Sequence, residues 1–164
     1  MPLFAITPAV LSVDGLAAEV AALASRAGEG CGAVTTFAGL VRAHHQGRRV
    51  RYLEYEAYEP LALKAFAQIQ AEASEAWAGA VLGMHHRTGR LEIGEASIVI
   101  AAASAHRAEA FAVCRYAIER VKQIVPVWKH EYFDGGEAWV EGAIADPSDA
   151  HAREQAKARA CASA

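Results

Sequence analysis

The chain has 164 residues and a formal net charge of −3, and 54% of its residues are hydrophobic while 21% are charged. This length and composition suit one globular domain with a sizeable core. The small acidic excess argues against a nucleic-acid or membrane-surface binder, since neither a basic excess nor a basic stripe dominates. No apolar run approaches the roughly 20 residues that cross a bilayer, and the first residues lack the charged n-region of a signal peptide.

The first part of the chain predicts an edge strand, a helix and two further strands. Residues 3–7 alternate as an edge strand does, and a helix capped by Ser12 or Asp14 follows to about residue 26. Two glycines, Gly28 and Gly30, are expected to end that helix. Residues 31–41 are rich in β-branched side chains and predict a buried strand. A polar loop then leads into residues 49–57, whose alternation predicts the next strand.

The middle of the chain predicts a helix between short strands. Pro60 is well placed at a first helical position, and the helix is expected to run to about residue 77. Residues 81–86 predict a short strand, and tight connections are expected at 88–89 and 91–95. Residues 96–103 are small and apolar, which predicts a strand buried on both faces.

Residues 104–131 join a long amphipathic helix to an extended segment. The helix is predicted from about residue 105 to residue 125, where Pro126 ends it. Residues 127–133 are then expected to pair with residues 137–140 across a hairpin turn. The alanine-rich, charged residues 145–164 predict a frayed helix or a mobile tail beside a domain of residues 1–144. Because helices and strands mix without strict βαβ alternation, an α+β fold is favoured.

Cationic groups lie at both ends of this helix. Ser104, His106 and Arg107 stand where a buried strand meets a helix N-terminus, a place where free backbone N–H groups attract anions. An equally supported alternative is that Ser104 caps the helix and the other two are solvated. Lys122 borders the apolar stripe, where it either snorkels to solvent or is partly desolvated. The simplest role for Lys129, which lies in a predicted hairpin strand, is an ion pair with a residue of the neighbouring strand.

The remaining polar motifs do not predict a metal site. Arg42 follows a buried strand and is a candidate anion-binding residue, next to the pair His44-His45. Adjacent histidines on a strand face opposite sides, and neither this pair nor His85-His86 has a third ligand at suitable spacing. The cysteines are odd in number, far apart and without a CxxC motif, which indicates free thiols in a reducing cytoplasm. They are Cys31, Cys114 and Cys161.

The length of the helix predicts an assembly. Arg107 and Lys122 are fifteen positions apart, which at 1.5 Å per residue is about 22 Å. Both therefore cannot touch one small substrate within one chain. If the two ends share a function, the site joins the front of this helix in one subunit to its back in another, as in a symmetric homodimer.

An ordered set of short motifs resembles the large, catalytic subunit of molybdopterin synthase, the MoaE-like family. The matching pieces, in order, are Gly32-Ala33-Val34, Phe37-Ala38-Gly39-Leu40-Val41-Arg42, Leu53-Glu54-Tyr55-Glu56-Ala57-Tyr58, His86-Arg87-Thr88-Gly89, Gly94-Glu95, Ser104-Ala105-His106-Arg107, Lys122, Pro126-Val127-Trp128-Lys129, Glu131 and Trp139-Val140. Together they span about residues 30 to 141. No piece is specific alone, but the ordered set is.

The resemblance implies an α/β-hammerhead type of α+β fold and a sulfurtransferase of molybdenum cofactor biosynthesis. In that family a homodimer of large subunits binds two small ubiquitin-like sulfur carriers, giving a heterotetramer. The carrier's C-terminal Gly-Gly thiocarboxylate supplies sulfur, and cyclic pyranopterin monophosphate becomes the dithiolene molybdopterin. No cofactor bound by the protein itself, no metal, no nucleic acid and no membrane is expected.

The resemblance also implies roles for individual residues. Lys122 and Lys129 would be catalytic. The substrate would be bound by Leu40, Val41, Arg42, His106, Arg107, His130 and Glu131. Leu40 stands where some members carry lysine, and His130 where a second basic residue is common, which makes the charge of the site more sensitive to pH near neutrality. The alternative is a non-catalytic module of the same fold that binds the carrier or the pterin.

Overall fold

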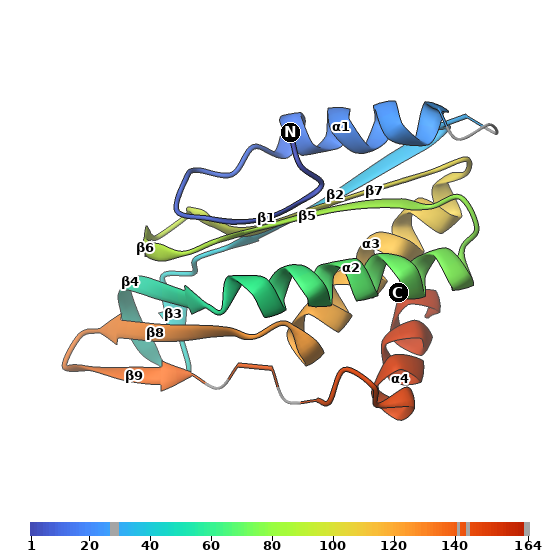
Figure 1. Cartoon of the computed structure of the whole chain (residues 1–164). Helices are drawn as coiled ribbons and strands as arrows, with labels where there is room; N and C mark the ends of the chain where they lie inside the picture. Colours follow the sequence, from blue (N-terminus) through green and yellow to red (C-terminus); the bar gives the residue numbers. More distant parts are fainter. Residues whose placement is uncertain (27–29, 141, 144, 163–164) are drawn as a thin grey trace.

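The chain folds into two β-sheets and four helices, within the residues that the structure describes. The structure is a computed structural model that describes residues 1–26, 30–140, 142–143 and 145–162. One sheet lies between helices, and the second extends from one end of that layer (Figure 1). This arrangement confirms the predicted α+β fold.

The main sheet has the strand order β1-β5-β7-β2. Its strands are β1 (Phe4–Thr7), β5 (Val81–Arg87), β7 (Ala96–Ser104) and β2 (Ala33–Leu40). β1 pairs with β5 in parallel, and the other pairs are antiparallel. β7 is a central strand and eight of its nine residues are buried, as the run of small apolar residues predicts. β2 is an edge strand in which partly buried and exposed residues alternate, so the prediction of a buried strand is wrong for the single chain.

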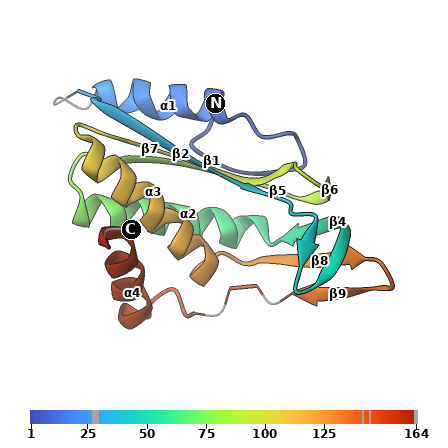
Figure 2. The same cartoon turned by 180° about the vertical axis from the view of Figure 1, so that it is seen from behind.

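Helices cover both faces of the main sheet (Figures 1 and 2). α1 (Val13–Arg26) packs on one face, and its first turn is capped by Ser12, whose Oγ accepts a hydrogen bond from the Gly15 N–H at 3.1 Å. α2 (Glu59–Ala76) and α3 (Arg107–Ile124) pack on the other face. α1 lies very close to the sheet at Gly83, because a Cβ there would stand 2.6 Å from Leu16 Cδ1. The expected role of Gly28 falls outside the described residues.

The second sheet is built from the hairpins at the end of the main layer. Its strands are β3 (His44–His45), β4 (Arg48–Ala57), β8 (Val127–Phe133) and β9 (Gly136–Val140), with β6 (Gly89–Glu92) paired to β4. The predicted hairpin of β8 and β9 is confirmed. Two connections were predicted as turns or loops and are strands instead, namely β3 and β6. Both are so short that only their pairing with β4 makes them strands, and local sequence does not reveal that pairing.

The alanine-rich C-terminal segment contains helix α4 (Ala150–Cys161), which packs on α3. Ala152, Ala156 and Ala160 recur every four residues and are buried, and the last two belong to the larger core cluster. The helix is therefore packed rather than frayed or detached over this range. The buried face of α4 consists only of alanines, so the sequence shows no large apolar stripe that would predict a packed helix.

Two details of α3 also differ from expectation. Ser104 is the last residue of β7, and the N-cap is His106, which makes no side-chain capping hydrogen bond. Phe111 lies in the apolar spacing of the helix but is 63% exposed. The buried side of α3 instead carries a charged residue, Arg120, which is 0% exposed.

Candidate active site

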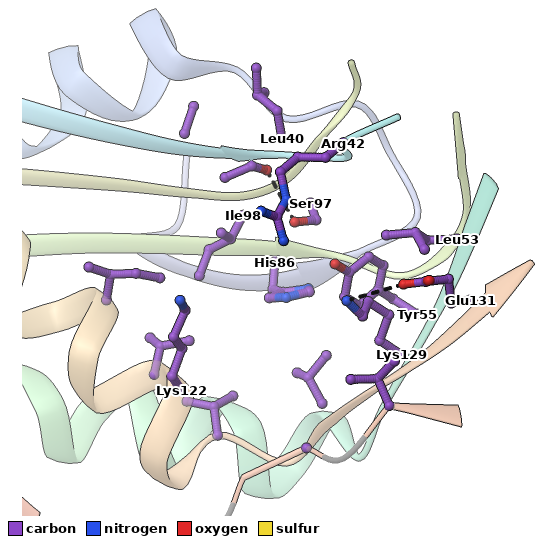
Figure 3. A pocket seen from close by; sticks show the side chains of 18 of the residues that line it. Leu40, Arg42, Leu53, Tyr55, His86, Ser97, Ile98, Lys122, Lys129 and Glu131 are labelled. Atoms are coloured by element: carbon purple, nitrogen blue, oxygen red, sulfur yellow. Dashed lines mark hydrogen bonds and ion pairs between the residues drawn. The ribbon is translucent and has the colours of Figure 1, made fainter. Parts of the chain in front are cut away.

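A cavity of about 770 Å³ lies where the main sheet, the second sheet and the end of α3 meet. Its lining residues come from segments spread over most of the chain. They include Phe37, Leu40, Arg42, His45, Tyr55, His86, Ser97, Ile98, Lys122, Val125, Lys129, Glu131 and Gly142. Figure 3 shows that the side chains it labels surround a common open space.

Three cationic side chains converge on this cavity from three different elements. Arg42 follows β2, Lys122 lies in the last turn of α3, and Lys129 lies on β8. Figure 3 shows Arg42 and Lys122 extending into the cavity from opposite sides, with Lys129 reaching in from a third. Among the described residues no carboxylate lies within ion-pair distance of Arg42 or Lys122. Such a cluster of free positive charges is suited to bind a small anion such as a phosphate or a carboxylate.

The end of α3 explains how two of these cations reach the same cavity. Val121 and Ile124 are buried in the core, so the intervening Lys122 sits at the edge of the buried face. Val125 leaves the helical conformation, with φ −82° and ψ 122°, and Pro126 prevents the helix from continuing. The chain then turns directly into β8, which carries Lys129.

Glu131 supplies the negative charge of the cavity. It is 1% exposed, and among the described lining residues it is the one acidic side chain. Its Oε2 lies 2.8 Å from His45 Nδ1 and 3.8 Å from Lys129 Nζ. Lys129 thus forms its ion pair with Glu131, two residues later on the same strand β8. The expected ion pair between neighbouring strands is not the one that forms.

Burial lowers the pKa of Lys129 below its ordinary value. The nearby charge of Glu131 opposes this effect, while the positive charges of Arg42 and Lys122 add to it. A lysine whose pKa is lowered has a larger neutral fraction at a given pH, so it can accept and return a proton more readily.

This balance of charges predicts a pH dependence. The substitution Arg42→Gln removes one neighbouring positive charge, so the pKa of Lys129 should rise toward its ordinary value. Any rate that needs neutral Lys129 increases with pH, and in R42Q that increase should move to higher pH. Because the chain has only four lysines, the Cε signals of ¹³C-lysine-labelled protein can report the titration directly.

Lys64 serves as the internal comparison in that titration, because it is exposed on α2 and does not line the cavity. Its signal should titrate identically in both proteins. An unchanged Lys129 titration in R42Q would contradict the assigned charge balance.

Aromatic and imidazole groups form another part of the cavity wall. His86 and Tyr55 meet edge to face, with ring centroids 5.1 Å apart. Burial lowers the pKa of His86 to about 4, so this imidazole stays neutral at physiological pH, and burial likewise raises the pKa of the Tyr55 hydroxyl. The sequence did not single out these residues as site residues, although both lie inside the motifs that carry the family resemblance.

The other residues predicted for the site lie elsewhere in this chain. His106 lines a separate surface pocket with Gly30, Cys31, Gly32 and Ala105 at the opposite end of α3, where Arg107 begins the helix. Val41 is buried beside the cavity in a small apolar cluster.

His130 alternates with Lys129 on β8 and lies between the rings of Tyr132 and Trp139, at 4.4 Å from each ring centroid. Of the predicted residues, the structure therefore brings five together at the cavity, which are Leu40, Arg42, Lys122, Lys129 and Glu131.

Two further features concern metal ions and membranes. Within the described ranges, histidine, cysteine, aspartate and glutamate side chains do not gather in any group of three or more suited to a metal ion. None of the described helices is both long enough and apolar enough to cross a membrane.

The fold and the cavity define an α+β protein with a cation-lined pocket of the type that binds small anions. A sequence profile described as MoaE protein matches residues 6–124. The molybdopterin synthase catalytic subunit of Bacillus subtilis (strain 168) is 54% identical over 109 residues, which are 66% of this chain and 69% of that protein. The corresponding subunit of Nostoc sp. is 45% identical over 139 residues, or 84% of this chain and 81% of that protein.

Solved structures agree with these sequence relatives. The crystal structure of molybdopterin synthase from Staphylococcus aureus has a TM-score of 0.79 and 38% identity, and covers 86% of this chain and 98% of that chain. A complex of subunits 1 and 2 of molybdopterin-converting factor from Helicobacter pylori 26695 shares the fold with a TM-score of 0.70 at 23% identity, and covers 90% of this chain and 98% of that chain. The chain belongs to the MoaE family, the catalytic subunits of molybdopterin synthase in molybdenum cofactor biosynthesis.

Proposed function

We propose that this chain transfers sulfur from the C-terminal thiocarboxylate of a small ubiquitin-like carrier to cyclic pyranopterin monophosphate, which yields the dithiolene of molybdopterin. The observation that supports this proposal most directly is the convergence of Arg42, Lys122 and Lys129 on one cavity. Both reactants are anionic, one through its phosphate and the other through its thiocarboxylate. The three cations would neutralise and orient them.

The residue types of the cavity fit chemistry in which the donor is already activated. In each transfer the thiocarboxylate sulfur forms a bond to a substrate carbon while an oxygen substituent leaves that carbon, and water cleaves the acyl–sulfur bond so that the carrier leaves as a carboxylate. The enzyme then needs no sulfur nucleophile of its own. None of the three cysteines, all in the described part of the chain, lines this cavity, and burial raises the pKa of Cys114 to about 12, which keeps that thiol protonated.

The roles of the lysines follow from their surroundings. Lys122 has its ammonium in the cavity and would act on the reacting carbon or on the thiocarboxylate. Lys129 lies next to Glu131, so it would hold the substrate and assist in proton transfer. Arg42 would grip the phosphate. The free thiols of the three cysteines support a cytoplasmic setting for this reaction.

The decisive experiment mixes this protein with its cognate carrier in thiocarboxylate form and the cyclic pterin, and follows formation of the dithiolene product. Product formation that depends on all three components is the expected result. Binding of the carrier or the pterin without any product would favour the alternative, a non-catalytic module of the same fold.

We also propose that the active assembly is a homodimer with one carrier on each subunit. Its support is that His106 and Arg107 lie at the opposite end of α3 from the cavity, where His106 lines a separate surface pocket. In a symmetric dimer this end would complete the cavity of the second copy. The relative from Helicobacter pylori, whose structure contains both subunits of the converting factor, makes a carrier partner plausible for this fold.

The dimer proposal predicts complementation between two inactive variants. R107A and K122A are each expected to lose activity. A dimer that combines one subunit of each retains one intact shared site, so random mixing after dissociation should restore about a quarter of wild-type turnover. Sedimentation should show a dimer in every case. A stable monomer that keeps its activity, or mixed dimers without recovery, would contradict the shared site.

A further inference from the structure

His45 makes a close contact inside the cavity that the proposed chemistry has not used. It is the second residue of the two-residue strand β3 and one of the residues that line the cavity. Its Nδ1 lies 2.8 Å from Glu131 Oε2. Lys129 Nζ lies 3.8 Å from the same oxygen. One carboxylate oxygen therefore serves both an imidazole and the lysine that we propose assists the reaction.

The other oxygen of the carboxylate makes the His45 contact more important. Glu131 Oε1 is buried, and among the described residues it has no hydrogen-bond partner. A buried carboxylate with few hydrogen-bond donors is energetically unfavourable, so loss of its one short hydrogen bond should destabilise the position of Glu131. Because a carboxylate only accepts hydrogen bonds, His45 must donate through Nδ1–H, and this contact fixes the tautomer of the neutral ring.

We propose that His45 is a positioning residue of this site, which holds the Glu131 carboxylate and thereby controls how much of its negative charge is available to Lys129. This inference rests on the proposed role of Lys129 in sulfur transfer. The hydrogen bond from His45 Nδ1–H takes up part of the negative charge on Glu131 Oε2, and the remaining charge balances Lys129.

The surrounding charges make the cavity sensitive to the hydrogen bond between His45 and Glu131. The titratable and charged side chains that line it beside His45 come from the segment after β2 and from β4, β5, α3 and β8, and are Arg42, Tyr55, His86, Lys122, Lys129 and Glu131. Among the described residues, the cavity has one carboxylate and three cationic side chains. The carboxylate that His45 contacts therefore carries the one negative charge among these lining residues. The cross-strand neighbour Arg48 is directed to the Phe133 ring, 4.4 Å from its centroid, and to Gln46.

Three substitutions separate the possible roles of His45. H45N keeps an amide N–H donor near the position of Nδ1. H45A removes the donor altogether. H44N is the matched control, because His44 is the adjacent histidine, is exposed, and does not line the cavity.

The first measurement follows the Cε signal of Lys129 in ¹³C-lysine-labelled protein as the pH is raised through the titration of that lysine. Loss of the Nδ1–H donor in H45A leaves more of the Glu131 charge to Lys129, so the pKa of Lys129 should be higher in H45A than in the wild type, whereas H45N and H44N should resemble the wild type. A merely structural role of His45 would not move this titration, and an unchanged Lys129 titration in H45A would overturn the proposal.

The second measurement is sulfur-transfer turnover with thiocarboxylated carrier at one fixed pH. H45A should be slower by about tenfold or more because Glu131 loses its donor, while H45N should stay within about threefold of the wild type. H45A that turns over like the wild type would also overturn the proposal. If even the wild-type protein forms no product, the proposed function fails, and the lysine titration still decides the role of His45.

Discussion

Lys122→Ala is expected to lower dithiolene formation about a hundred- to thousandfold, the usual effect of removing a charge that stabilises a reacting anion. The ammonium of Lys122 lies in the cavity, and no carboxylate among the described residues is within ion-pair distance. Its positive charge is therefore available to the reactants. Because the side chain is exposed at the edge of α3, its truncation should leave the fold intact.

The measurement combines single-turnover product formation with calorimetric titration of the carrier. Carrier affinity should remain close to the wild-type value in K122A, so that the defect lies in the chemical step. Lys64→Ala is the matched control, because this lysine is exposed on α2 and does not line the cavity. Full turnover by K122A would refute the catalytic assignment of Lys122.

Arg120→Met is expected to lower the free energy of unfolding by about 3–5 kcal/mol, because it leaves a buried carboxylate without its partner. Arg120 is 0% exposed and donates from Nε to Glu72 Oε2 and from Nη2 to Glu72 Oε1, both at 2.8 Å. Arg120 Nη2 also reaches the Pro147 carbonyl at 3.3 Å. The network therefore joins α2, α3 and the segment that leads to α4.

Thermal and urea unfolding at one fixed protein concentration will measure this loss, since stability depends on concentration in an oligomer. A fall in melting temperature of about 10 °C corresponds to the expected change in a chain of this length. The double variant Glu72→Met/Arg120→Met should recover most of the stability, because it removes both charges together. Recovery should be incomplete, since Tyr116 donates to Glu72 at 2.7 Å and would lose its acceptor. An R120M protein as stable as the wild type would refute this role of the network.

The pKa of Glu72 gives the sign of the pH effect. Burial raises this pKa, but hydrogen bonds from Arg120, Gln68 and Tyr116 outweigh burial, so the pKa in the folded protein is lowered. The unfolded chain then binds the proton more tightly than the folded one. The contribution of Glu72 is accordingly present above the unfolded pKa of about 4.3 and is lost as the pH falls through the folded value.

Much of the local structure could be predicted because each segment carries its own signal. The strand β7 consists of small apolar residues that need burial on both faces, and α2 begins with a proline where a helix tolerates one. Pro126 ends α3 and releases β8, which is why Lys122 and Lys129 could be expected near one another. The small error at β3 and β6 arose because neither strand exists without its partner β4.

What the sequence by itself determined is the longer helices and strands up to β9, the α+β class, and the cations at the two ends of α3, because hydrophobic periodicity and helix-ending residues act over a few positions. The tertiary structure alone decided which distant groups meet. His45 and Glu131 are 86 positions apart and Glu72 and Arg120 are 48 apart, yet each pair is in direct contact. Such contacts depend on how helices and sheets pack together, and no local pattern in the chain encodes that packing. The three cations of the cavity and Glu131 were therefore predictable as site residues, whereas the contact between Glu131 and His45 became evident only in the folded chain.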